Sequence, residues 1–178
     1  MNKPARNMLA VEDLQARERD AAVTRAEYEL QRLAAEYRVE IGPEIDRMRS
    51  IFVQARKLLR EERFETACMA FDEIHRSAMD IRGIAATYGF RLATLAAASL
   101  CRILEGMVDP ADGSMQAIET HLDVLDEVFS DNIGGDGGPR GAVLVKQMEH
   151  LRRLSAQESA AARPGVIAAR GPRSLQNQ

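Results

Sequence analysis

The clearest pattern in this sequence is the recurrence of apolar residues at alternating steps of three and four, the period of a helix with one buried face. Four consecutive segments between residues 43 and 131 show it. Their apolar positions are Ile45, Met48, Phe52, Ala55, Leu59; Phe64, Ala67, Phe71, Ile74, Ala78, Ile81, Ala85, Tyr88; Leu92, Leu95, Ser99 or Leu100, Ile103, Met107; and Met115, Ile118, Leu122, Leu125, Phe129. The pattern predicts four amphipathic helices, the second ending at Gly89.

Four such helices with short connections pack most simply as an antiparallel up-and-down four-helix bundle, so we predict an all-α fold over residues 43–131. Residues 1–42 are charged and alanine-rich and predict a long, partly exposed N-terminal helix that ends at Gly42-Pro43. A glycine-rich flexible linker is expected at 132–140, a further helix at 141–158 and a disordered tail at 159–178. The C-terminal helix would present Leu144, Met148, Leu151 and Leu154 on one face.

Composition and charge exclude several classes of protein. Aromatic residues make up only 4% of the chain and Trp is absent, which favours helices over sheets. The net charge of −3 argues against nucleic-acid binding, which needs a basic surface. The sequence contains no run of about 18 apolar residues, the length that a membrane span requires, and no recognisable signal peptide. We therefore expect a cytoplasmic location.

The sequence contains no motif of a conventional enzyme. Cys68 and Cys101 lack metal-ligand spacing and fall in apolar patterns, so we expect reduced, buried thiols. His121 and His150 are expected on solvated helix faces. The segment from Asn132 to Gly141 lacks the residue order of a phosphate-binding loop. We therefore expect no metal, no cofactor and no enzymatic activity.

The second predicted helix carries an unusual polar face. His75, Met79, Arg82, Gly83 and Ala86 share one side, next to the apolar seam, because they are separated by three, four or seven residues. A solvated helix face normally carries long charged side chains, and a glycine within a helix costs about 1 kcal/mol relative to alanine. Small residues on an exposed face indicate that another molecule comes close.

The residues of this face resemble the histidine-containing phosphotransfer (HPt) family, whose motif is His-x-x-Lys-Gly followed by small residues and a helix-ending glycine. Met79-Asp80-Ile81-Arg82-Gly83 aligns with that motif, and Gly89 aligns with the closing glycine. The segment 99–105, SLCRILE, resembles the family's small-Leu-Cys-x-x-Leu-Glu run. The likeness covers about residues 44–130. It implies that Arg82 and Gly83 keep the family's positions, while Met79 stands where the family has its phosphorylated histidine.

Three functions follow from this resemblance or compete with it. The first is a pseudo-HPt protein that binds the receiver domain of a response regulator or hybrid kinase without transferring phosphate, because a thioether cannot form a phosphoramidate. The second is an active phosphotransfer protein that uses His75, one turn upstream, as the acceptor. The third is an all-α scaffolding protein unrelated to phosphorelay. The charged N-terminal helix permits a homodimer without requiring one.

Overall fold

The computed structural model describes residues 3–107 and 112–161, and the burial of side chains at position 15 and over 17–107 and 114–157. Within these residues the secondary structure is helical and contains no strand, which confirms the all-α prediction. The helices are α1 (Lys3–Arg60), α2 (Phe64–Ile84), the 3-10 helix η1 (Ala85–Tyr88), α3 (Arg91–Gly106), α4 (Asp112–Ser130) and α5 (Gly138–Ala161).

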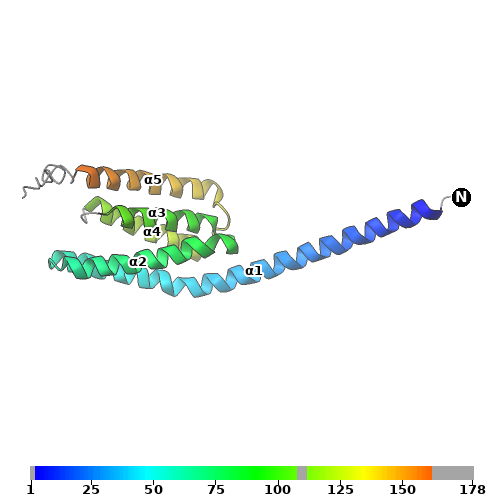
Figure 1. The fold of residues 1–178 in the computed structure, drawn as a ribbon, viewed down its shortest axis with the longest axis horizontal. Helices are drawn as coiled ribbons and strands as arrows, with labels where there is room; N and C mark the ends of the chain where they lie inside the picture. Colours follow the sequence, from blue (N-terminus) through cyan, green and yellow to red (C-terminus); the bar gives the residue numbers. More distant parts are fainter. Residues whose placement is uncertain (1–2, 108–111, 162–178) are drawn as a thin grey trace, which may run out of the picture.

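The helices surround a common apolar core. The second half of α1 packs against α2 and α4, α3 packs against α2 and α4, and α5 lies on α3 and α4. Figure 1 shows these helices side by side, while the first half of α1 projects away from them. Residues 17–33, which we call the arm, are exposed without exception. The chain thus combines a packed helical body with an exposed arm, which is the N-terminal part of α1.

The predicted apolar stripes supply most of the core, with three exceptions. Phe64 is 56% exposed, Leu95 44% and Leu154 38%. Phe64 is the first residue of α2 and precedes the part of the helix that is packed. In α3 the core positions between Leu92 and Leu100 belong to three alanines and Ser99. These small residues let the neighbouring helices approach α3 closely, and Leu95 is turned outward.

The expected break between the first two helices does not occur. Helix α1 continues through Gly42 and Pro43, so the N-terminal extension and the bundle share one helix. A proline inside a helix removes one hydrogen bond and bends the helix, and α1 changes direction where it leaves the packed body (Figure 1). Ile41 and Ile45, one on each side of the proline, both pack against the core and hold the helix together there.

The glycine-rich segment, expected as a flexible linker, makes backbone hydrogen bonds to Gly89 and Leu92. The Gly135 N–H donates to the Gly89 carbonyl at 2.6 Å, and the Leu92 N–H donates to the Gly135 carbonyl at 2.9 Å. A side chain at Gly141 would place its Cβ 1.9 Å from the Asp136 carbonyl oxygen. Glycine is therefore required here for close packing, and the segment is fixed against the start of α3.

Helix α5 also exceeds its predicted bounds of 141–158 at both ends. The first residues of the predicted tail, 159–161, are helical, while residues 162–178 lie outside the described part of the chain. Residues 108–111 also lie outside the described part of the chain, and α4 begins at Asp112.

Two polar residues were placed wrongly by the sequence pattern. His121 is fully buried instead of solvated, because α3 and α5 cover α4 in addition to α1. Its Nδ1–H donates to the Ala117 carbonyl at 2.6 Å, and its Nε2 lies 2.8 Å from the Ser99 hydroxyl. Cys68 is exposed, whereas Cys101 is buried as expected, and both thiols are free.

Candidate partner-binding face

Met79, Arg82, Gly83 and Ala86 form one exposed surface on α2 and η1, which we call the Met79 face. The adjoining side of the same helix carries Ile74, Ala78 and Ile81, each with no exposed surface. The apolar seam fixes the rotation of α2, and the helical period then turns the Met79 face outward. The structure thus brings together four of the five site residues expected from the sequence.

Gly83 is not required by the packing of this chain. A Cβ built on Gly83 would meet nothing within 4 Å, and its φ is not in the left-handed region. Gly83 lies next to the last residue of α2 rather than in mid-helix, although η1 continues the turn as far as Tyr88. The missing side chain therefore leaves open space on the outer surface, in contrast to Gly141, where the fold demands it.

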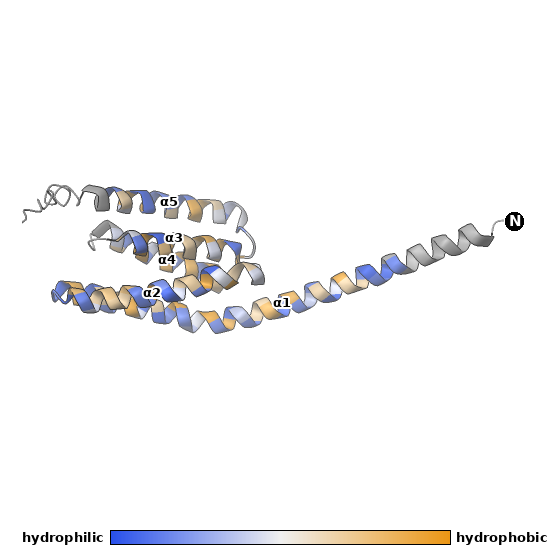
Figure 2. Cartoon of the chain, in the orientation of Figure 1, coloured by the Kyte–Doolittle hydropathy of each residue, from blue (hydrophilic) through white to orange (hydrophobic). Residues whose placement is uncertain are grey.

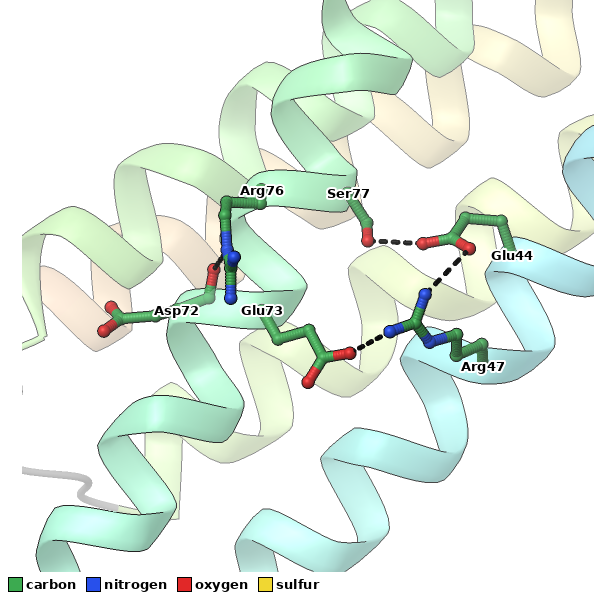
Figure 3. Close-up of polar contacts among 6 residues, drawn as sticks. All are labelled: Glu44, Arg47, Asp72, Glu73, Arg76 and Ser77. Carbon is green, nitrogen blue, oxygen red and sulfur yellow. Dashed lines mark hydrogen bonds and ion pairs between the residues drawn. The ribbon is translucent and has the colours of Figure 1, made fainter.

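The Met79 face is free of the ion pairs that fix the side of α2 that faces α1. On that side, Glu44 accepts a hydrogen bond from the Ser77 hydroxyl and Arg47 pairs with Glu73, as Figure 3 shows. Arg82 has no ion-pair partner among the described residues. It lies near the buried Cys101 thiol: burial raises the pKa of Cys101, and Arg82 opposes that rise. A guanidinium on the Met79 face is therefore available to an acidic partner.

His75 is separated from the Met79 face by its interactions. Its side chain is 28% exposed, and its Nε2 lies 3.1 Å from a carboxylate oxygen of Glu105 on α3. The imidazole lines a pocket of about 150 Å³ together with Phe71, Asp72 and Leu104. His75 thus belongs to a groove between α2 and α3 and not to the exposed surface with Met79.

An aromatic cluster holds the C-terminal end of this surface in place. Tyr37 of α1 stacks on Tyr88 of η1 with 4.6 Å between ring centroids and meets the Phe129 ring edge-on at 5.8 Å. Burial raises the pKa of Tyr37 to about 12, with smaller contributions from Tyr88 and Asp80. The cluster fixes η1, and with it Ala86, against α1.

Met79 gives the Met79 face a contact group rather than a proton-transfer group. Met79 is 36% exposed, and its thioether is a flexible apolar group that neither donates nor accepts a proton in the physiological range. In the part of the chain that the structure describes, no group of three or more His, Cys, Asp or Glu residues could hold a metal ion. The surface suits adaptable contact with another protein.

Two residues near the site carry no signal in the sequence. Glu105 belongs to the SLCRILE run, but its pairing with His75 depends on how α2 and α3 align and has no sequence signal. The part played by Tyr37 at the end of η1 has no signal in the sequence either, because residues 11–40 show only a loose apolar period.

No helix among the described residues is long and apolar enough to span a membrane. A scan against protein-family models and searches of curated proteins and of solved structures found no match to this chain.

Proposed function

We propose that this protein is a pseudo-HPt protein, which binds the receiver domain of a response regulator or hybrid kinase without accepting phosphate. The observation that carries the proposal is the exposure of Met79, Arg82, Gly83 and Ala86 on one surface. This surface combines a free guanidinium, an adaptable thioether and room for close approach. A positive charge with open space beside it suits a partner protein that has an acidic pocket.

The arrangement of the helices supports the same proposal. Each of the helices from α1 to α4 packs against the next, and α4 returns to α1, as in an up-and-down four-helix bundle. The long N-terminal part of α1 and the helix α5 are then additions to an HPt-like core. Fold analogy alone does not establish a function, so the proposal rests on the Met79 face.

Phosphotransfer through His75 has less support. In-line transfer requires the acceptor nitrogen to face the partner with little positional error. The Glu105 carboxylate lies at the Nε2 atom of His75, where its negative charge would repel an incoming phosphoryl group. His75 also lies one turn, about 5–6 Å, from the position of Met79.

The proposal is tested by mixing the full chain with the receiver domains of its source organism and measuring both binding and transfer of radioactive phosphate. Binding without labelling of the chain is the expected result. Labelling that is abolished by His75→Gln would establish the His75 mechanism instead. Failure of the chain to bind any receiver domain would favour the alternative of an all-α scaffolding protein unrelated to phosphorelay.

A further inference from the structure

The arm of α1 carries an exposed apolar stripe. Val23, Leu30 and Leu33 are 55%, 48% and 40% exposed, and Ala26 between them is exposed as well. Figure 2 shows apolar positions recurring along this part of the helix. At the same spacing the stripe continues into Tyr37, which packs against the core. The apolar seam of the body therefore runs on into solvent.

The stripe has the spacing of a coiled coil. Residues 11–40 as a whole show only a loose apolar period, but Val23 and Leu30 take the a position of a heptad repeat, and Ala26 and Leu33 take the d position. The flanking e and g positions carry no large apolar residue; they are Asp20, Ala22, Glu27, Glu29, Ala34 and Glu36. A stripe confined to a and d is narrower than the apolar face of a helix in a globular core. It therefore fits one other helix.

The charges beside the stripe select the partner. Every charged residue at the flanking e and g positions is acidic, on both sides of the stripe. Arg32 stands at a c position, farther from the stripe, and its guanidinium lies 3.0 Å from a carboxylate oxygen of Glu29 and 2.8 Å from one of Glu36. These three side chains are more than half exposed, and such pairs contribute little to stability. A cation of a partner can therefore take the place of Arg32.

We propose that the arm binds a basic amphipathic helix of another protein as a two-stranded coiled coil. This partner helix has apolar residues at a and d, which pack on Leu30 and Leu33, and Lys or Arg at e and g, which pair with the carboxylates of the arm. Arg19 at the preceding d position ends the stripe, so the stripe from Val23 to Leu33 is about 15 Å long. The apolar contact is short, and the flanking charges decide which helix binds.

The inference is independent of the proposed function, because it uses the arm and not the Met79 face of α2 and η1. Binding at one surface can be lost while binding at the other persists. The two proposals are therefore tested separately.

A second copy of this chain complements the arm less well. It brings neither Lys nor Arg at the flanking e and g positions, so two arms form no ion pair across the contact. A parallel pair would also force the two bodies together, because the body begins at Tyr37 on the stripe side of α1 and coiled-coil helices remain close along their length. An antiparallel pair avoids that collision but sets carboxylates against carboxylates. The homodimer that the sequence permits is therefore an outcome of the test.

The test is a fluorescence-anisotropy titration of two labelled synthetic peptides with the full chain. Each peptide is about three heptads long with leucine at a and d, and it carries either lysine or glutamate at every e and g position. We expect the lysine peptide to bind wild type, and the glutamate peptide to bind at least about tenfold more weakly. Leu30→Glu with Leu33→Glu should raise the Kd of the lysine peptide at least about tenfold, because the apolar contact is lost although negative charge is gained.

Tyr28→Glu with Val39→Glu is the matched control. Tyr28 and Val39 lie on the opposite side of α1 from the stripe and are 67% and 72% exposed, so this variant adds the same charge to the same helix. It should change the Kd of the lysine peptide by less than about twofold. Glu27→Lys with Glu29→Lys should weaken binding of the lysine peptide and strengthen binding of the glutamate peptide.

Failure of the lysine peptide to bind wild type overturns the inference. Equal binding of the two peptides removes the selection by charge, and equal weakening by the leucine variant and its control removes the apolar contact, so either result also overturns it. Sedimentation velocity tests the other occupant. A wild-type dimer that Leu30→Glu with Leu33→Glu dissociates assigns the stripe to a second copy of this chain.

Discussion

Met79 determines which chemistry the exposed surface of α2 can perform. Its side chain is on the surface, beside Arg82 and one turn from Gly83, but a thioether has no nucleophilic nitrogen and carries no proton. If Met79 replaces a phospho-acceptor on a surface that still binds receiver domains, one substitution should restore phosphotransfer.

Met79→His is therefore expected to accept phosphate from a phosphorylated receiver domain. The P–O bond of the receiver's aspartyl phosphate would break and a P–N bond to the new imidazole would form, with magnesium supplied by the receiver. Radioactive label should appear on the variant and not on the wild type. Met79→His combined with Gly83→Glu should lose the label again, because a bulky anion repels an acidic partner. Continued labelling of that double variant would show that transfer does not pass through the Met79 face.

His121 gives the stability of the chain a predictable pH dependence. Burial lowers the pKa of His121 from its ordinary value of 6.5. Its Nδ1–H is donated to a carbonyl, so Nε2 accepts from the Ser99 hydroxyl in the neutral form. The unfolded chain binds the proton more readily than the folded chain does. The stabilisation that comes from neutral, buried His121 is therefore complete above pH 6.5. It is lost as the pH falls, by at most about 1.4 kcal/mol per pH unit.

Urea unfolding at pH 7.5 and pH 5.5 checks this expectation. Wild type should lose more stability between the two values than His121→Leu, in which the titrating group is absent while His75 and His150 remain. The variant is expected to be less stable at pH 7.5, because the Ser99 hydroxyl loses its buried partner, at a cost of about 1–3 kcal/mol. An identical loss in both proteins would show that His121 titrates alike in the folded and unfolded chain.

The positions of single residues could be predicted where the helical period alone decides them. The exposure of Arg82, Gly83 and Ala86 follows from the position of the buried seam on α2. The burial of His121 could not be predicted, because it depends on the coverage of α4 by neighbouring helices. The pairing of His75 with Glu105 depends likewise on the alignment of two helices, which leaves no trace in the spacing of either one.

Helix α2 shows how far an apolar seam determines the packing of an element. Phe71 is 4% exposed in the middle of the seam, whereas Phe64 at the first position of α2 is 56% exposed. Both residues fit the same period in the sequence. The period identifies the face of a helix but not the length of helix that its neighbours cover.

Phe71→Ala should therefore destabilise the chain by about 3–5 kcal/mol, as large-to-small changes in a core do. Phe64→Ala removes the same atoms from an exposed site and should cost less than about 1 kcal/mol. Denaturant unfolding of both variants measures the difference. A loss at Phe71 as small as that at Phe64 would mean that the seam does not face the core.

Helix α1 shows where local signals fail. Gly42 and Pro43 are strong stop signals, yet the helix continues, because Ile41 and Ile45 pack against the core on either side of them. The cost of a proline within a helix, about 3 kcal/mol, is exceeded by the burial of the surrounding apolar residues. Tertiary packing outweighs local propensity here, and the sequence pattern gives no measure of tertiary packing.

In the whole molecule, the packed body and the arm meet at the end of α2 that carries the Met79 face (Figure 1). The body fixes the rotation of α2, the aromatic cluster around Tyr37 fixes η1, and the arm extends an apolar stripe beyond them. Under the proposed function, a receiver domain binds at this end of the molecule.

The most direct measurement is a titration of one receiver domain into wild type, Gly83→Ala and Gly83→Glu. Nothing lies within 4 Å of a Cβ at Gly83, so both variants should keep the fold, and alanine should add up to about 1 kcal/mol of helix stability. Binding is expected for wild type and for Gly83→Ala, with Gly83→Glu weakened at least about 100-fold by charge repulsion at the interface. Unchanged binding by Gly83→Glu, or no binding by wild type, would contradict a receiver-binding function of the Met79 face.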